Sequence, residues 1–407
     1  MAARERRPVG RGDPPLEGRP GRRVVIVGPV HPFRGGIAHF TTSLANAAAK
    51  VHSVEVLSFR RLYPKILYPG GSDQDPSRAR FGLECPADYR LDALNPLTWL
   101  AAARWMGSRP PDFVVLPWWT TFLALPLGWL GRLLRRRRIP VIFLVHNVLP
   151  HERRRSDRAL ARWALRGGDG YVVLTQSEKA RLMDILPRTE VVAVSPHPVY
   201  RLFAAGRIDR VEARRRLRVP EAAPILLFFG FVRPYKGVDS LLEAIKLLHD
   251  RGPAPYLLVA GEVWDDGARL RRRIESLGIQ ERVRIDDRYI PNEEVGTYFS
   301  AADVFVAPYT AGTQSGSLRI AMDFSLPVVV TETIAPAEGF PDGRGRVVPA
   351  GDALALAQAI AEMIALGGAP IGPSDSLKAD GGWSALVATL AELADQVRAM
   401  RRTTRRR

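Results

Sequence analysis

The strongest constraint on the fold of this chain is a repeated alternation between short apolar runs rich in valine and isoleucine and longer stretches with helical spacing. One series of runs begins at Val24 and a second begins at Ile225. Short apolar runs that are bounded by Gly or Pro and separated by helices are typical of buried parallel strands. We therefore predict an α/β protein with two doubly wound, Rossmann-like domains that face each other across a cleft.

Each series predicts a set of strands and helices. The strands expected in the first half are Val24–Val27, Val54–Ser58, Phe113–Leu116, Val141–Val145, Tyr171–Leu174 and Val191–Val194. Those expected in the second half are Ile225–Phe229, Tyr256–Ala260, Val283–Ile285, Val304–Ala307 and Val328–Val330. The expected helices are Ile37–Ala49, a buried helix with a basic end over Trp118–Leu134, one starting at Ser240 and Trp383–Met400. Glu243 follows Ser240 at capping-box spacing.

The length of 407 residues also favours two domains, because a single hydrophobic core seldom grows so large. We expect a disordered leader at residues 1–21, a first domain at 22–200, a linker at 201–219 and a second domain at 220–380. A C-terminal helix at 381–400 is expected to pack back on the first domain, and residues 401–407 form a basic tail.

Cysteine content and hydropathy limit the cellular setting. Cys85 is the only cysteine, which excludes a disulfide within the chain and favours a reducing compartment. No run of eighteen uncharged apolar residues occurs, and the N-terminus lacks the apolar core of a signal peptide. We expect a cytoplasmic protein that is neither exported nor membrane-spanning.

The formal net charge of +17 predicts attraction to anionic surfaces. Many of the arginines cluster between Arg132 and Arg166, close to apolar side chains, which suits peripheral contact with the anionic inner face of the cell membrane. A solvated basic face is the alternative. Nucleic acid is not an expected partner, because the sequence contains no recognised binding module.

Two glycine-containing loops each follow an expected strand and precede an expected helix. Gly35 and Gly36 lie in the first, where missing side chains allow backbone N–H groups to approach a phosphate or a sugar. The second runs from Gly230 and places Arg233 and Lys236 three residues apart, a spacing that suits a diphosphate. Tight turns and solvated surface cations are the alternatives.

With these loops the chain resembles the family 4 glycosyltransferases, which are retaining enzymes of the GT-B fold. The resemblance rests on an ordered set of segments between about residues 22 and 365. They are Gly35-Gly36-Ile37, the segment from His146 to Glu152, Phe229-Gly230 with the segment from Arg233 to Val238, Ala302-Asp303, Pro308-Tyr309, and Val348-Pro349-Ala350-Gly351-Asp352. It implies that the second domain binds a nucleotide-diphosphate sugar and that the first binds the acceptor.

One segment departs from the commonest family pattern. Most members carry two glutamates seven residues apart after the position of Pro308, whereas this chain has Thr313, Gln314, Ser315 and Gly316 there, with Ala321 at the second glutamate position. The chain is similar to a subgroup with a TQSG segment, often found in exopolysaccharide and cell-surface glycan synthesis. Backbone amides and hydroxyls of this segment can hold phosphate or sugar oxygens. A Ser/Gly turn before a buried helix is the alternative.

Further candidates lie at strand ends in the first domain. His146 follows Val141–Val145, and the resemblance implies that it contacts the transferred sugar; a capping histidine is the alternative. Candidate acceptor contacts are Trp118, Trp119, Asn147, His151 and Glu152. Core packing is the alternative for one of the tryptophans.

The expected reaction is transfer of a hexose from a nucleotide-diphosphate sugar to a lipid-linked or polysaccharide acceptor. The leaving diphosphate gains negative charge, which Arg233 and Lys236 can stabilise, with His146 as the third catalytic candidate. The resemblance implies retention of configuration without a dedicated protein base. The alternatives are a catalytically silent GT-B binding subunit, which the missing glutamates favour, and a sugar-nucleotide epimerase.

No cofactor and no metal are expected. Asp73-Gln74-Asp75 imitates a metal-binding DxD segment, but it lies in a Gly/Pro/Ser-rich stretch without a preceding strand. Asp286-Asp287 ends an expected strand, yet no third carboxylate lies nearby in sequence. Glu338-Gly339-Phe340 follows the strand Val328–Val330 and so comes too late to be the missing glutamate motif.

Overall fold

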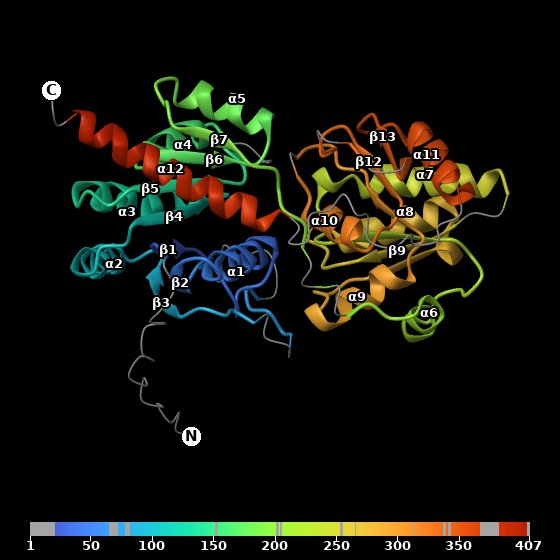
Figure 1. Ribbon diagram of the computed structural model, residues 1–407. Coiled ribbons are helices and arrows are strands. Elements are labelled where there is room, and N and C mark those ends of the chain that lie inside the picture. The colour runs from blue at the N-terminus through green and yellow to red at the C-terminus, as the bar shows by residue number, and fades with distance from the viewer. Residues whose placement is uncertain are drawn as a thin grey trace, which may run out of the picture.

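The computed structural model describes residues 21–64, 72–77, 82–150, 154–200, 203, 206–252, 255–264, 266–312, 314–336, 339–340, 343–366 and 382–404. Each half of the chain forms its own parallel sheet with helices on both faces, and the two halves lie side by side (Figure 1). The predicted fold class of two Rossmann-like domains is therefore confirmed.

The first domain is built on a seven-stranded sheet in the order β3-β2-β1-β4-β5-β6-β7. Its strands are β1 (Arg23–Val27), β2 (Ser53–Arg61), β3 (Ala87–Asp92), β4 (Phe113–Trp118), β5 (Val141–Val145), β6 (Gly170–Val173) and β7 (Val192–Val194). Alternate residues of β1 point to opposite faces: Val24 and Ile26 join the core beneath α1 (Gly36–Ala49), and Val25 and Val27 join the core on the other face. That second core is covered by α2 (Pro96–Ser108), α3 (Ala124–Arg136), α4 (Asp157–Leu165) and α5 (Gln176–Ile185).

The second domain has a six-stranded sheet in the order β10-β9-β8-β11-β12-β13. Its strands are β8 (Ile225–Phe229), β9 (Tyr256–Ala260), β10 (Val283–Asp286), β11 (Val304–Ala307), β12 (Val328–Thr331) and β13 (Gly345–Val348). Its helices are α6 (Arg210–Leu217), α7 (Val238–Asp250), α8 (Gly267–Leu277), α9 (Asn292–Ala301), α10 (Gly316–Asp323) and α11 (Ala353–Ala365). Short 3₁₀ turns cover Thr121–Leu123, Pro234–Lys236 and Gln280–Arg282.

Three local predictions differ from the structure. The helix expected from Ser240 begins at Val238, so the proposed capping box is wrong: Gly237 in a left-handed conformation precedes the helix, without a side-chain cap. The helix expected over Trp118–Leu134 begins at Ala124, because Trp118 still belongs to β4 and Thr121–Leu123 forms a 3₁₀ turn. Strands β3 and β13 were not predicted, because both are partly exposed edge strands without a continuous apolar run.

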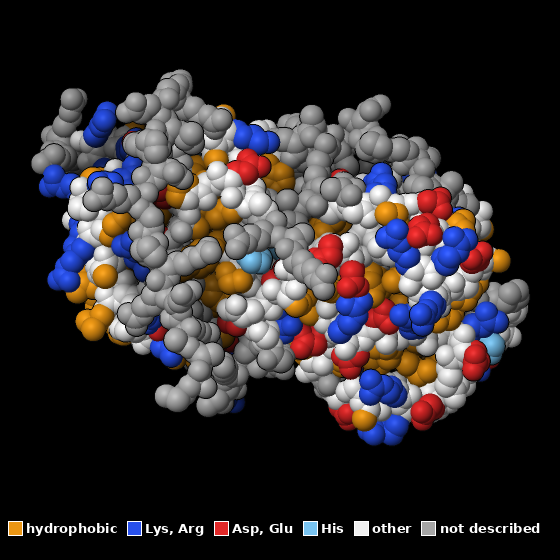
Figure 2. Space-filling view, turned by 90° about the horizontal axis from the view of Figure 1, so that it is seen from below, with side chains coloured by type: hydrophobic (Ala, Val, Ile, Leu, Met, Phe, Trp, Pro, Cys, Tyr) orange, Lys and Arg blue, Asp and Glu red, His pale blue; other side chains and the backbone are white. Residues whose placement is uncertain are grey.

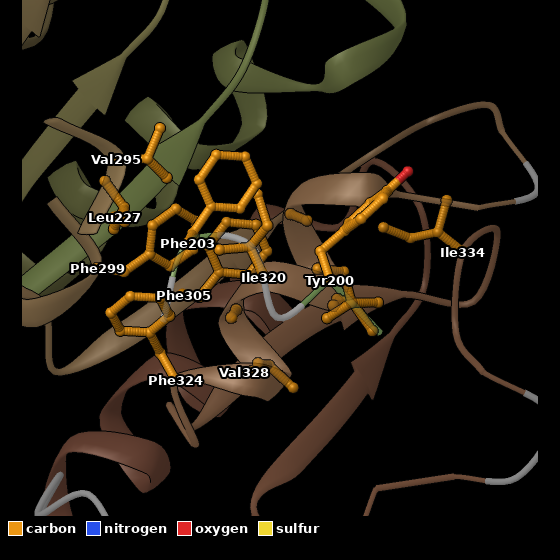
Figure 3. Close-up of a cluster of buried hydrophobic side chains, with 14 of the residues drawn as sticks. Tyr200, Phe203, Leu227, Val295, Phe299, Phe305, Ile320, Phe324, Val328 and Ile334 are labelled. Carbon is orange, nitrogen blue, oxygen red and sulfur yellow. The ribbon is translucent and has the colours of Figure 1, made fainter. Parts of the chain in front are cut away.

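The chain between the two sheets is packed against the second domain. Tyr200 and Phe203 are buried and belong to the cluster that contains Phe299 and Ile320. The Phe203 ring lies toward Phe299, whereas the Tyr200 ring points away from it, to the side of Ile334 (Figure 3). The Tyr200 hydroxyl also donates a hydrogen bond to the carbonyl oxygen of Gly36, 3.2 Å away, in the first domain. Helix α6, within the segment expected as a linker, packs against α9.

The final helix, α12 (Trp383–Thr404), crosses back onto the first domain beside α1 and over β5, β6 and β7 (Figure 1). Trp383 at its start donates a hydrogen bond to the carbonyl oxygen of Val199 at 2.9 Å. Near its end, Arg398 pairs with Asp112 at 2.6 Å. Helix α12 therefore packs against the first sheet.

Candidate functional site

A cavity of about 200 Å³ lies between the two domains. From the first domain it is lined by Gly35, Gly36 and His39. From the second it is lined by residues that follow β8 and β9 and by the start of α10, among them Gly230, Lys236, Gly261, Glu262, Gly316 and Ser317. The carboxyl ends of both parallel sheets therefore contribute to one cleft, where ligands of such folds bind.

Lys236 is the cation at the floor of this cavity. Its Nζ donates a hydrogen bond to the Tyr309 hydroxyl at 2.5 Å and lies 4.0 Å from the centre of the Tyr309 ring. The Tyr309 hydroxyl also lies 3.1 Å from Ser315 Oγ and 3.4 Å from Ser317 Oγ. The ammonium group is thus held in place by a network of hydroxyl groups, of which that of Ser317 belongs to a residue that also lines the cavity.

This network also keeps Lys236 charged. Burial alone lowers the pKa of a lysine, but the nearby oxygens of Tyr309 and Tyr235 outweigh it and raise the pKa of Lys236. Burial would raise the pKa of Tyr309, and the adjacent Lys236 ammonium reverses this and lowers it. A charged ammonium in a partly enclosed cleft is suited to bind an anionic group.

Arg233 lies on the same loop but is placed differently. Its guanidinium lies 5.3 Å from the Trp264 ring and 5.7 Å from the Tyr235 ring, both cation–π distances. The described residues that line the cavity include Lys236 but not Arg233. The structure thus brings Lys236 into the cleft and leaves Arg233 against aromatic rings at its edge.

Two helices begin at the cavity wall. Helix α1 starts at Gly36, after Gly35 with a φ of 101°, and a Cβ on either glycine would meet open space. Helix α10 starts at Gly316 and is capped by Ser315, whose Oγ accepts from the Leu318 N–H at 3.2 Å. Positive helix ends and lysine together favour an anion at this place.

The loop glycines are required by close backbone contacts. Gly237 has a φ of 69°, and a Cβ there would lie 1.9 Å from the Pro308 carbonyl oxygen. Gly261 has a φ of 146°, and its Cβ would lie 2.1 Å from the Gly230 carbonyl oxygen. These contacts fix the path of the loop that carries Lys236.

Of the other two residues of the TQSG segment, the structure describes Gln314. Gln314 is half-buried, and its side-chain nitrogen has no hydrogen-bond partner within the described part of the chain. A buried amide without a partner is unusual and is consistent with a ligand contact. Thr313 lies outside the described residues.

His146 follows β5 but is enclosed. It is 6% exposed, its ring stacks edge-on against Phe40 with centroids 4.6 Å apart, and burial lowers its pKa to about 3. Its Nε2 is buried and has no partner among the residues that the structure describes. The imidazole is neutral at physiological pH and can exchange hydrogen bonds with a neutral hydroxyl.

The expected acceptor residues differ in accessibility. Trp118 is fully buried and donates to the Val148 carbonyl oxygen at 3.2 Å, so its ring has no exposed face through which to bind a sugar. Trp119 is half-buried and donates to the Tyr63 hydroxyl at 3.1 Å. Asn147 is half-buried, and His151 and Glu152 lie outside the described residues.

Sequence reasoning did not single out several cavity residues. They are His39, Glu262, Tyr289, Asn292 and Ser317. Tyr309 belongs to the Pro308-Tyr309 segment of the family resemblance and follows β11 as Lys236 follows β8, but it was not predicted as a site residue. His39 and Asn292 lie within the first turns of α1 and α9, and their sequence context carries no comparable signal.

The acidic segments are not arranged as a metal site. Asp75 forms hydrogen bonds with the second domain, Asp286 accepts from the Tyr298 hydroxyl at 2.6 Å, and Glu338 lies outside the described residues. The described residues contain no group of three His, Cys, Asp or Glu side chains placed to share a metal ion. They also contain no helix with both the length and the apolar content needed to cross a bilayer.

Comparison with known families matches both halves of the chain. Residues 35–198 match the model of the glycosyl transferase 4-like domain, and residues 223–365 match that of glycosyl transferases group 1. Apart from Tyr200 and Phe203, the described residues that line the inter-domain cavity lie within these two matches. The chain belongs to the GT-B glycosyltransferases.

Individual relatives of this glycosyltransferase agree over different spans. The GDP-mannose-dependent alpha-(1-6)-phosphatidylinositol monomannoside mannosyltransferase of Mycolicibacterium smegmatis is 28% identical over 82% of this chain and 87% of its own length. The D-inositol 3-phosphate glycosyltransferase of Corynebacterium glutamicum is 30% identical over 46% of this chain and 48% of its own length. The GDP-mannose:glycolipid 4-beta-D-mannosyltransferase of Xanthomonas campestris is 28% identical over 47% of this chain and 49% of its own. The chain thus spans about half the length of two of these three relatives.

Solved structures support the fold of this glycosyltransferase. Sucrose-phosphate synthase from Thermosynechococcus elongatus superposes with a TM-score of 0.69 at 20% identity, covering 93% of this chain and 100% of that one. Anabaena Alr3699/HepE, solved in complex with UDP and glucose, superposes with a TM-score of 0.66 at 16% identity, covering 94% of this chain and 100% of that one. At these identities the likeness concerns the fold alone.

Proposed function

We propose that this chain transfers a hexose from a nucleotide-diphosphate sugar to a lipid-linked or polysaccharide acceptor, with retention of configuration and without a metal. The observation that carries the proposal is Lys236, held charged by Tyr309 in a cavity that both domains line. A diphosphate that departs from an anomeric carbon gains negative charge, and a fixed cation beside two helix N-termini stabilises that charge.

Lipid and glycolipid acceptors are supported by the activities for which two relatives are named, the mannosyltransferases of M. smegmatis and X. campestris. Both names specify GDP-mannose as the donor, which makes it the first donor to test. One name specifies an alpha linkage and the other a 4-beta linkage, so stereochemistry differs among the relatives. Retention therefore has to be measured on the product of this enzyme itself.

The test uses purified protein with GDP-mannose and UDP-glucose, in parallel reactions with and without membranes from the host cell. We expect release of the nucleoside diphosphate that depends on the membranes, a lipid-extractable product that carries the sugar, and an anomeric NMR coupling that shows the donor's configuration. The rate should not change with EDTA. Release of free sugar without acceptor dependence, or interconversion of the nucleotide sugars, would instead support hydrolysis or epimerisation.

The protein is further proposed to sit on the cytoplasmic face of an anionic membrane. A groove of about 1070 Å³ in the first domain is lined by the C-terminal ends of α3 and α12 and by residues around the start of β7. Arginines dominate its lining: Arg132, Arg135, Arg136, Arg138, Arg188, Arg398, Arg401 and Arg402, against Asp169 and Glu190. Figure 2 shows Lys and Arg gathered at the outer end of this domain, whereas they mix with Asp and Glu over the second.

Exposed apolar side chains accompany this groove on α3. Leu125 is 53% and Trp129 45% exposed, and both lie on the same helix as Arg132 and Arg136. Each arginine near an anionic leaflet contributes about 1 kcal/mol, and a tryptophan suits the interface between headgroups and water. Such a surface would bring the enzyme to a lipid-linked acceptor.

Charge neutralisation tests this contact. The variant with Gln at Arg136, Arg188 and Arg402 should bind vesicles of phosphatidylcholine with phosphatidylglycerol about a hundredfold more weakly than wild type, since about 1 kcal/mol is lost per site. A control with Gln at Arg215, Arg216 and Arg251, exposed in the second domain, has the same net charge and should bind as wild type does. Equal losses in both variants would contradict a localised surface.

A further inference from the structure

Asp75, part of an apparent DxD segment, connects the two domains. Its side chain is 2% exposed. Its Oδ2 accepts a hydrogen bond from Asn292 Nδ2 at 2.7 Å and from the Tyr289 hydroxyl at 3.3 Å, and both partners belong to the second domain. A carboxylate taken out of water in this way is stable only while those donors are present.

The segment around Asp75 is fixed to the first domain beside the glycine loop. The Asp75 N–H donates to the Pro32 carbonyl oxygen at 2.7 Å, and the Arg34 N–H donates to the Asp73 carbonyl oxygen at 3.0 Å. Residues 32–34 lead directly into Gly35 and Gly36, which line the cavity. The position of Asp75 is therefore linked through these hydrogen bonds to the residues that precede the cavity wall.

On the other side the segment supplies the missing cap of α9. The N-cap residue of that helix, Pro291, makes no side-chain cap. Instead the Asn292 N–H donates to Ser77 Oγ at 2.8 Å, and the Ser77 N–H donates to Asp75 Oδ1 at 2.8 Å. The carboxylate also lies at the positive end of α9, which favours its charge. One domain thus caps a helix of the other.

A second polar contact joins the domains at the same cavity. Arg34 pairs with Glu262 at 2.7 Å, and its guanidinium lies 5.6 Å from the Phe231 ring and 5.2 Å from the Tyr289 ring. Tyr289 therefore contacts both Arg34 and Asp75. Together these contacts surround the cavity that contains Lys236.

From these contacts we infer that Asp75 is a positioning residue that latches residues 72–77 onto the start of α9 and holds the cleft closed around the donor. The inference rests on the proposed function for its catalytic consequence, but the latch itself is a property of the unliganded protein. When the latch is broken, a donor must bind a closed state that is populated for a smaller fraction of the time. The apparent donor affinity then falls in proportion to the population of the closed state, while the rate of the chemical step in the closed complex is unchanged.

Asp75→Ala tests the latch, and Asp73→Ala in the same segment is the matched control. Asp73 is half-buried, and within the described part of the chain only its backbone carbonyl oxygen forms a hydrogen bond, which it accepts from the Arg34 N–H. We expect Asp75→Ala to increase the radius of gyration in small-angle X-ray scattering without ligand, and Asp73→Ala to leave it unchanged. With GDP-mannose or UDP-glucose, KM should rise about tenfold or more and kcat should change less than twofold. Asp75→Asn keeps one acceptor oxygen for Asn292 but loses the charge and the second acceptor, so it should recover only part of both effects.

A double-mutant cycle separates a latch from a general loss of stability. Because Asp75 and Asn292 form one contact between domains, Asn292→Ala should reproduce the effect of Asp75→Ala, and the double variant should add little to either. An unchanged radius of gyration in the folded Asp75→Ala protein, or effects of the two variants that add fully, would overturn the latch. If the variants show a larger radius of gyration but the wild-type protein turns over no donor, the latch would be supported and the proposed function rejected.

Discussion

Replacement of Lys236 by Met is the most informative single change, because it removes the charge and keeps most of the side-chain volume. In the unliganded protein the loss of stability is small, because the Tyr309 hydroxyl keeps Ser315 and Ser317 as hydrogen-bond partners. In the transition state the departing diphosphate loses one charge-assisted hydrogen bond, worth about 1.5 to 3 kcal/mol. The value of kcat/KM should therefore fall by about ten- to 150-fold.

The assay is nucleoside diphosphate release from the donor that stabilises the wild-type protein most in a thermal-shift screen. Lys246→Met is the matched control, because Lys246 lies on the exposed side of α7 and pairs with Asp250 in the same helix. We expect that control to keep wild-type kcat/KM. Unfolding by denaturant should show both variants to be folded. A kcat/KM for Lys236→Met within threefold of wild type would refute the role assigned to this ammonium group.

Three further predictions concern stability. Burial lowers the pKa of His146 and His197 to about 3, so between that pH and about 6.5 the unfolded state binds more protons than the folded state. The free energy of unfolding should therefore fall as the pH drops below 6.5, by about 2 kcal/mol per histidine at pH 5. Denaturant titrations at pH 7.5 and 5.0 check this, and His146→Asn should reduce the pH dependence. Gly237→Ala should lower the free energy of unfolding by at least about 2 kcal/mol, because the new Cβ would collide with Pro308, whereas Gly278→Ala, at a similar φ of 67° with open space around it, should lower it by only about 1 kcal/mol. Equal losses in the two variants would show that the collision with Pro308 is relieved. Arg214→Met should lower the free energy of unfolding by about 3 kcal/mol, because it removes the buried partner of Asp303 and the donor to the Ala301 and Ala223 carbonyl oxygens, while Arg210 still pairs with Asp303. A loss below 1 kcal/mol in the thermal or denaturant transition would contradict this.

Strand bounds were predicted most closely for buried strands, and the partly buried edge strands β7 and β10 were predicted to within one residue at one end. The runs Val141–Val145, Ile225–Phe229, Tyr256–Ala260 and Val304–Ala307 became strands with the predicted bounds, because strands covered on both faces are apolar throughout. The edge strands β3 and β13 carry mixed burial and gave no such signal. The start of α7 was predicted wrongly because the residue before it, Gly237, adopts a left-handed backbone conformation and no side chain caps the helix. That conformation depends on a close contact with Pro308, which lies far along the chain.

The site was predictable where a residue directly follows a strand. This rule found the loop with Lys236 and the glycine pair before α1, which the structure places at one cavity. It missed the contacts between the domains, because Asp75 and Asn292 are 217 positions apart and only the packing of the two sheets brings them together. The contacts of the Asp73-Gln74-Asp75 segment with the second domain carry no signal in the sequence around it.

A crystal structure with a bound nucleoside diphosphate tests the central claim most directly. The account predicts that the diphosphate lies in the cavity between the domains, with an oxygen within hydrogen-bond distance of Lys236 Nζ and others facing the N–H groups at the start of α10. A diphosphate bound elsewhere, with Lys236 still paired only to Tyr309, would contradict it.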